Sequence, residues 1–214
     1  MTDAVVFDLD GVLIDSEQVW DEVREQLVRE VGARWHEGAQ REMMGMSSVE
    51  WSRYMHDELG VPDPPEAISA EVVRRLEERY RSRLPLIDGA SEAVERLAAR
   101  WTLGLASSSN REVIDFVLQV SGLAQFFRVT VSSEEVPRGK PAPDVYLEAA
   151  RRLEVSPEGC AAIEDSENGI RAAKAAGMRV IAIPNPHYRP GDEALALADV
   201  TLDSLAELTP STVA

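Results

Sequence analysis

The sequence predicts an α/β protein in which a doubly wound parallel sheet carries an inserted all-helical segment. Short, apolar, β-prone runs alternate with single amphipathic stretches over most of the chain. Strands and helices that alternate in this way form right-handed βαβ units, which build a parallel sheet. One long segment, residues 16–83, breaks the alternation, because it contains helical patterns and no convincing strand.

The first expected strand covers residues 4–8, whose run Ala-Val-Val-Phe-Asp is typical of a strand buried on both faces. Similar runs follow the helical segment, at residues 102–106, 128–131, 160–163, 179–183 and 199–202. Amphipathic stretches between the later runs predict helices, at residues 92–99, 110–120, 144–153 and 169–176. These elements assign residues 1–15 and 84–214 to an α/β core.

The intervening residues 16–83 are expected to form a helical cap, or lid, domain. Apolar residues at helical spacing predict a first helix, which Gly32 ends. Ser47 and Glu50 have the spacing of a capping box, which begins a second helix. A third helix is expected over residues 66–80, after a proline-rich turn.

Composition limits the class of partner. The chain has 22 Lys and Arg residues against 38 Asp and Glu, a net charge of −16, which disfavours nucleic acid and acidic membrane surfaces. No apolar run approaches the roughly 18 residues of a membrane span, and the N-terminus lacks the basic residues of a signal peptide. The single Cys160 fits a reducing compartment. We expect a cytoplasmic protein, and composition leaves its oligomeric state open.

Polar residues with catalytic potential occur where expected strands end or helices begin: Asp8, Asp10, Ser107, Ser108, Lys140, Glu164 and Asp165. The carboxyl ends of parallel strands share one edge of the sheet, where α/β proteins bind ligands. The sequence therefore predicts that four separate segments converge on one small region.

Four carboxylates in one site repel each other strongly unless a cation holds them. Oxygen ligands without a His or Cys cluster favour Mg²⁺. Lys140 adds a positive charge, and the helix expected after Ser107 offers free N–H groups at its N-terminus. Distant surface charges are largely screened beyond about 8 Å at physiological salt. A small phosphorylated ligand can therefore bind despite the acidic balance.

The segments around Asp8 and Asp10, Ser107, Lys140, and Glu164 with Asp165 resemble, in this order, the four motifs of the haloacid dehalogenase superfamily. With a helical insert after the first motif, the chain is similar to the branch that holds β-phosphoglucomutase, phosphoglycolate phosphatase and sugar-phosphate phosphatases. The resemblance covers nearly the whole chain. It implies a Rossmann-like core whose cap closes over the site.

The resemblance implies a role for each carboxylate. Asp8 would be the nucleophile that forms an aspartyl-phosphate. Asp10 would protonate the leaving oxygen and then activate water, which requires a carboxyl group that titrates near the working pH. Asp8, the backbone carbonyl of Asp10 and Asp165 would hold Mg²⁺, with Glu164 as a further ligand or as a partner of one.

Phosphate binding and substrate choice are also implied by the resemblance. Ser107, Ser108 and Lys140 would bind the phosphoryl oxygens. The cap would exclude bulk water and select the leaving group. Candidate specificity residues lie mainly in the cap: Trp20, Gly45, Met46, Ser47 and Asn110.

Three of these positions depart from the β-phosphoglucomutase pattern. Trp20 stands where such sequences carry a histidine, and Asn110 replaces a lysine. The loop that contains Gly45 and Ser47 lacks the arginine expected after such a serine. These departures weaken the mutase interpretation.

The sequence therefore predicts a Mg²⁺-dependent phosphatase that hydrolyses a small phosphorylated metabolite, such as a sugar phosphate, through an aspartyl-phosphate. One alternative is a sugar phosphomutase of the β-phosphoglucomutase type, which shares the first half-reaction. An alternative of another class is a receiver-type signalling module, which also uses a strand-end aspartate, a metal and a lysine. Such a module has no need for the helical insert or for Asp10.

Overall fold

A computed structural model describes residues 2–44, 46–185 and 188–214. Its centre is a parallel sheet in the order β3-β2-β1-β4-β5-β6. The strands are β1 (Ala4–Phe7), β2 (Thr102–Ser107), β3 (Phe127–Ser132), β4 (Cys160–Glu164), β5 (Arg179–Ala182) and β6 (Val200–Thr201). This order reverses at β1, as in doubly wound folds that bind ligands beyond the carboxyl ends of their strands.

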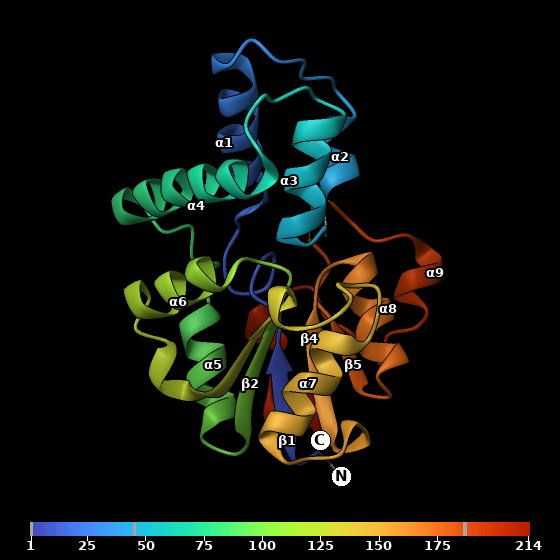
Figure 1. The fold of residues 1–214 in the computed structure, drawn as a ribbon. Coiled ribbons are helices and arrows are strands. Elements are labelled where there is room, and N and C mark those ends of the chain that lie inside the picture. Colours follow the sequence, from blue (N-terminus) through green and yellow to red (C-terminus); the bar gives the residue numbers. More distant parts are fainter. Residues whose placement is uncertain (1, 45, 186–187) are drawn as a thin grey trace.

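Helices cover both faces of the sheet (Figure 1). On one face lie α5 (Ala90–Ala98) and α6 (Arg111–Val120), and on the other lie α7 (Asp144–Leu153) and α8 (Glu167–Ala175). Alternate residues of β1 pack against the two helical layers, because successive side chains of a strand point to opposite faces of the sheet. Val5 and Phe7 pack with the α5 and α6 layer, whereas Ala4 and Val6 pack with the α7 and α8 layer.

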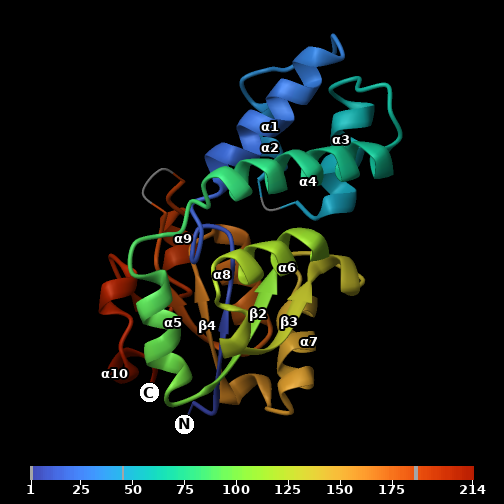
Figure 2. The same cartoon turned by 90° about the vertical axis from the view of Figure 1, so that its left-hand side faces the viewer.

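Four helices lie together beyond the carboxyl edge of the sheet (Figure 1 and Figure 2). They are α1 (Glu17–Glu30), α2 (Ala39–Met43), α3 (Ser48–Asp57) and α4 (Pro65–Ser82). Gly32 has a φ of +71° just after α1, and Ser47 and Glu50 form the expected capping box of α3. The sequence did not predict α2, because five residues are too few to show a helical period. The predicted fold class, with its inserted helical cap, is confirmed.

The remaining elements are short and connect the layers. They are the helices α9 (Asp192–Leu195) and α10 (Pro210–Val213) and the 3₁₀ turns Ala124–Phe126, Ser133–Glu135, Pro157–Gly159 and Leu205–Glu207. Each predicted strand and core helix is present, with its ends shifted by up to two residues. The shifts that matter place Ser107 and Glu164 as the last residues of β2 and β4.

The cap is seated on the core in this conformation. Ser48 at the start of α3 donates a hydrogen bond of 2.5 Å to the Glu134 carboxylate of the core. Asn110 Nδ2 donates to Ser69 Oγ of α4 at 3.0 Å and also to Glu134 Oε1 at 3.0 Å. One continuous apolar cluster runs from the sheet through the cap, so burial and hydrogen bonds both connect the two parts.

One arginine, Arg96, links α5 to the C-terminal segment through hydrogen bonds. Arg96 Nε donates to the carbonyl oxygen of Leu208 at 3.0 Å, and Nη2 donates to the carbonyls of Leu205 at 3.0 Å and Leu208 at 2.8 Å. Both carbonyls belong to the segment around the last 3₁₀ turn. The guanidinium therefore satisfies backbone groups that are far from α5 in the sequence.

We expect Arg96→Ala to lower the free energy of unfolding by about 2 kcal/mol, because it removes charged donors and leaves two carbonyls without them. Urea denaturation measures the change. The matched control is Arg29→Ala, which removes one exposed pair with Glu25 and should cost less than about 0.5 kcal/mol. Equal losses in the two variants would contradict a special role for Arg96.

Candidate active site

The loop after β1 begins the site. Asp8 directly follows the strand, and its backbone N–H donates to the Ile163 carbonyl at 3.0 Å, so the loop starts in register with β4. Gly11 has a φ of +78°, which L side chains rarely adopt. A Cβ at Gly11 would lie only 1.9 Å from the Asp165 carboxylate. Glycine at this position therefore permits both the turn and the close approach of the two loops.

Three buried carboxylates meet at the edge of the sheet. Asp8, Glu164 and Asp165 each offer an oxygen, and these oxygens lie within 4.8 Å of one another. Lys140 Nζ lies 3.0 Å from Asp8 Oδ1 and 2.7 Å from Glu164 Oε1. The structure therefore brings together four side chains from three of the four segments that the sequence predicts to converge.

Burial controls the electrostatics of this cluster. Burial raises the pKa of Asp8 well above its usual value, although the Lys140 ammonium acts in the opposite direction. Burial and then the charge of Glu164 raise the pKa of Asp165 as well. For Lys140, burial disfavours the charged form, but the facing carboxylates of Asp8 and Glu164 outweigh it and raise its pKa. The ammonium of Lys140 is thus held charged among the acids.

Glu164 is fully buried and committed to neighbouring donors. Its Oε1 accepts from Lys140 Nζ at 2.7 Å and from the Tyr146 hydroxyl at 2.6 Å. Its Oε2 accepts from Ser166, through the backbone N–H at 3.3 Å and the hydroxyl at 3.1 Å. A Cβ at Gly169 would lie 1.8 Å from this carboxylate, so glycine at the start of α8 gives it room. These contacts suit a residue that positions Lys140.

The acidic cluster fits a divalent cation. Asp165 Oδ1 is buried and has no hydrogen-bond partner among the residues that the structure describes. Buried polar oxygens of this kind are normally satisfied, by protein, water or an ion. When the carboxylates of Asp8, Glu164 and Asp165 are all ionised, the one ammonium of Lys140 leaves two negative charges. A divalent cation would balance them and coordinate the free oxygen of Asp165.

Asp10 connects the core to the cap. Its Oδ1 accepts from Ser16 Oγ at 2.5 Å and from Trp20 Nε1 at 3.2 Å. Its Oδ2 accepts from Ser109 Oγ at 2.6 Å and from Ser107 Oγ at 3.3 Å. Trp20 lies on α1, so the carboxylate is held by both parts of the molecule in this conformation.

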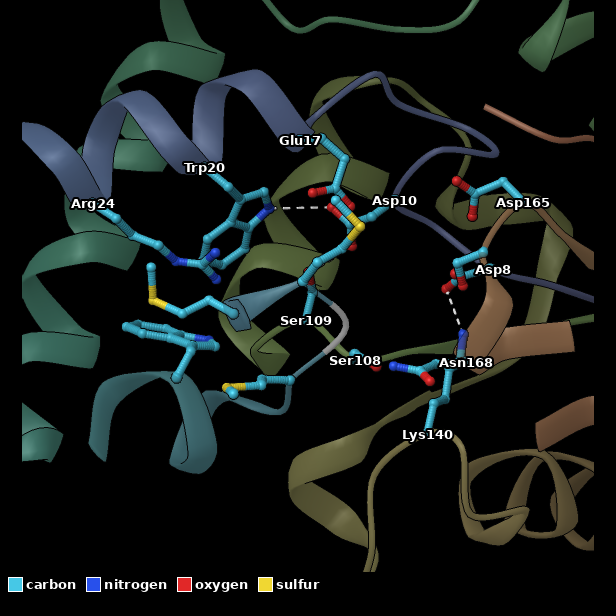
Figure 3. Close-up of a pocket in the computed structure, with 15 residues that line it drawn as sticks. Asp8, Asp10, Glu17, Trp20, Arg24, Ser108, Ser109, Lys140, Asp165 and Asn168 are labelled. Atoms are coloured by element: carbon cyan, nitrogen blue, oxygen red, sulfur yellow. Dashed lines mark hydrogen bonds and ion pairs between the residues drawn. The ribbon is translucent and has the colours of Figure 1, made fainter. Parts of the chain in front are cut away.

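A cavity of about 70 Å³ lies between the cluster and the cap (Figure 3). Seven residues of the predicted site line it: Asp8, Asp10, Trp20, Met46, Ser108, Lys140 and Asp165. This volume is well below the roughly 300 Å³ at which typical ligand pockets begin. With the cap in this position, the cavity has room for only a small ligand.

The structure places four of the predicted residues that it describes outside the lining of this cavity. Ser107 is fully buried beneath it, where its hydroxyl accepts from the Ser109 backbone N–H and donates to Asp10. Ser47 caps α3 and bonds to the Glu50 side chain. Asn110 bonds to the cap and to Glu134, as described above, and lines a different cavity. Glu164 also lies behind the lining, and Gly45 lies outside the described residues.

The sequence analysis missed several residues that line the cavity, among them Glu17, Arg24, Trp51, Ser109 and Asn168. A signal for two of them is visible in the helical spacing, because Glu17, Trp20 and Arg24 share one face of α1. Burial raises the pKa of Glu17 to about 7, and the nearby Asp10 charge adds to this effect. Burial lowers the pKa of Arg24 to about 10, although the charge of Glu17 opposes it.

The comparisons with known proteins agree with this arrangement. A family model for haloacid dehalogenase-like hydrolases matches residues 2–177. The chain belongs to the haloacid dehalogenase-like hydrolase family. The predicted resemblance to this family is thereby confirmed.

Named relatives of this hydrolase are phosphatases. Hexitol phosphatase B of Escherichia coli (strain K12) is 37% identical over an alignment of 210 residues, which covers 96% of this chain and 94% of the relative. (DL)-glycerol-3-phosphatase 1, mitochondrial, of Arabidopsis thaliana is 32% identical over an alignment of 220 residues, which covers 96% of this chain and 71% of the relative. The hydrolase is therefore an enzyme of the phosphoric monoester hydrolase class, as predicted.

A solved structure supports the same fold. The crystal structure of CbbY from Rhodobacter sphaeroides in complex with phosphate has a TM-score of 0.87 and 28% identity, and the match covers 100% of this chain and 99% of that one. In the part of the hydrolase that the structure describes, no helix combines the length and apolar character needed to cross a membrane.

We expect Gly169→Ala to destabilise the hydrolase by about 1–3 kcal/mol, because the new methyl group collides with the Glu164 carboxylate. Helix propensity alone predicts a gain of up to about 1 kcal/mol, so the sign of the change tests the contact. Gly191→Ala is the control, since its φ is −63° and its nearest atom would lie at an ordinary 3.6 Å. Thermal melting of both variants measures the effect, and a Gly169→Ala protein as stable as wild type would refute the steric argument.

Proposed function

We propose that the protein is a Mg²⁺-dependent phosphatase that hydrolyses a small phosphorylated metabolite, such as a sugar phosphate, through an aspartyl-phosphate on Asp8. The observation that carries the proposal is the buried contact of 3.0 Å between Asp8 and Lys140, next to the unpartnered oxygen of Asp165. Asp8, Lys140 and Asp165 all line the cavity, which supports their proposed roles as nucleophile, phosphate ligand and metal ligand.

In the first half-reaction, an oxygen of the Asp8 carboxylate attacks the phosphorus of the substrate. The bond between phosphorus and the leaving oxygen breaks, and that oxygen keeps the electron pair and takes a proton from Asp10. Lys140 lies against Asp8, where its charge can stabilise the phosphoryl oxygens. The products are the free alcohol and the phosphorylated Asp8.

In the second half-reaction, water attacks the phosphorus of the aspartyl-phosphate and gives a proton to Asp10. The bond between phosphorus and the Asp8 oxygen breaks, so inorganic phosphate leaves and the Asp8 carboxylate is restored. Asp10 thereby returns to the protonation state in which it began, with a proton that comes from water. The cavity between core and cap is small, about 70 Å³, so little bulk water can enter while the cap is in this position.

Mg²⁺ is the proposed metal, because the available ligands are hard oxygens. Asp8, Asp165 and the backbone carbonyl of Asp10 would hold it. When bound, the ion would neutralise negative charge on the transferring phosphoryl group. Both oxygens of Glu164 are already hydrogen-bonded, so we assign Glu164 to the positioning of Lys140.

Ser108 is the proposed phosphate ligand of the β2 loop. Its hydroxyl is buried, lines the cavity, and has no hydrogen-bond partner within the described part of the chain. Ser107 is bonded to Asp10 and to the Ser109 backbone, so we propose that it holds the loop in place beneath the phosphate.

The relatives support small substrates, since two carry names that refer to phosphates of hexitols and of glycerol. We also propose that residues 16–83 act as a cap that opens to admit substrate, while residues 1–15 and 84–214 form the catalytic core. The net charge of −16 argues against nucleic acid as a partner, and the single cysteine is consistent with work in the cytoplasm.

Purified protein should hydrolyse p-nitrophenyl phosphate in the presence of Mg²⁺ and should lose this activity with EDTA. Asp8→Asn removes the nucleophile, so we expect kcat/KM to fall at least about 1,000-fold. Circular dichroism of the variant controls for folding. Measurement of free phosphate and of isomerised product on sugar phosphates separates hydrolase from mutase: isomer without phosphate release would overturn the proposal, as would persistent activity in Asp8→Asn.

Mg²⁺ should raise the melting temperature of the wild-type protein, because it binds the folded acidic cluster and not the unfolded chain. Asp165→Asn should abolish this shift. In EDTA the variant should be at least as stable as wild type, since it removes one of three mutually repelling carboxylates. Differential scanning fluorimetry gives both numbers. An equal Mg²⁺ shift in the two proteins would place the metal elsewhere.

A further inference from the structure

Helix α1 presents two side chains of opposite charge type to the cavity, Glu17 and Arg24. Glu17 and Arg24 are two helical turns apart on the same face, and both line the cavity (Figure 3). Within the described residues, neither side chain makes a hydrogen bond or an ion pair, and Arg24 Nε is fully buried. A donor and an acceptor are thus available on the cap side of the cavity.

Two tryptophans fix the position of Arg24. Its guanidinium carbon lies 4.6 Å from the Trp20 ring centroid and 4.8 Å from the Trp51 ring centroid. The two rings pack edge to face with their centroids 5.9 Å apart. Because the planar group is held over aromatic rings, its N–H donors remain free at its edge. A ligand that uses them meets a preorganised donor and does not have to order a flexible side chain.

Stability alone does not account for this arrangement. Arg24 is only 6% exposed, and burial of a charged donor without a hydrogen-bond partner is unfavourable. An apolar side chain between Trp20 and Trp51 would pack there without that cost. A buried, unpartnered donor that lines a cavity is instead typical of a site completed by a ligand.

We propose that Arg24 and Glu17 recognise the hydroxyl groups of the uncharged part of the substrate, a deduction that rests on the proposed phosphatase function. A hydroxyl group both donates and accepts, so it can accept from the Arg24 edge and donate to the Glu17 carboxylate. The substrate class is then a monophosphate of a sugar or polyol.

A second anionic group on the substrate suits this site poorly. The positive charge of Arg24 is already opposed by the charges of Glu17, Asp21 and Asp10. A second phosphate beside Arg24 would meet the repulsion of Glu17 and Asp10, which line the same cavity. The volume of about 70 Å³ also leaves little room for two phosphate groups. The chemistry therefore favours a neutral hydroxylated chain.

The test compares glycerol 3-phosphate with n-propyl phosphate, which has the same carbon chain without the two hydroxyls. Arg24→Met keeps an unbranched side chain between the tryptophans and removes every donor. We expect the ratio of kcat/KM for glycerol 3-phosphate over propyl phosphate to fall about 10-fold or more, mainly through KM for glycerol 3-phosphate. Glu17→Ala should lower the same ratio, and Arg24→Lys should recover part of it.

Arg29→Ala is the control, because Arg29 lies on the exposed side of the same helix and should leave the ratio unchanged. An unchanged ratio in Arg24→Met and Glu17→Ala would overturn the inference and assign both residues a structural role. A larger loss on 3-phosphoglycerate than on glycerol 3-phosphate would identify an anion site instead. If a melting experiment shows that Arg24→Met does not fold, the substrate ratio of Glu17→Ala alone tests the inference.

The two proposals fail in different ways. Wild-type protein that hydrolyses neither propyl phosphate nor p-nitrophenyl phosphate with Mg²⁺ would overturn the proposed function itself. Wild-type protein that hydrolyses both, with variants whose substrate ratio does not change, would overturn only the assignment of Arg24 and Glu17.

Discussion

The contact between the Lys140 ammonium and the carboxylates of Asp8 and Glu164 is the constraint on which the site depends. Three acids lie buried at the end of the sheet, and burial makes their mutual repulsion severe. One ammonium, 3.0 Å from Asp8 and 2.7 Å from Glu164, offsets part of it. The remaining negative charge explains why the same cluster that would be costly in a metal-free core suits a divalent cation.

The local backbone follows from this cluster. Asp165 can approach the β1 loop only because Gly11 has no side chain, and Glu164 can bend under α8 only because Gly169 has none. The Tyr146 hydroxyl from α7 satisfies Glu164 from a third direction. Two glycines and one buried tyrosine thus belong to the site although none of them contributes a reactive group.

The cap is coupled to the chemistry through Asp10. Its carboxylate accepts hydrogen bonds from Trp20 on the cap and from Ser109 on the core. The hydrogen bonding of the residue proposed to transfer protons therefore depends on the position of the cap. Trp20 in turn holds Arg24 over the cavity. Cap position, proton transfer and substrate recognition therefore share one chain of contacts, which gives a physical reason for a helical insert in a phosphatase of this kind.

The sequence by itself determined the α/β alternation, the helical insert, the positions of Asp8 and Asp165 directly after strands, and that of Lys140 in the loop before a helix. These features depend on local periodicity and on short motifs, which can be recognised in the sequence without knowledge of the tertiary structure. Only the tertiary structure decided which side chains face the cavity. Asn110 was expected there but bonds to the cap instead, and Arg24 resembles an ordinary solvent-facing helix residue until α3 brings Trp51 against it. Which side chains become buried at the cavity depends on long-range packing, because a helix face has no partner until another element covers it.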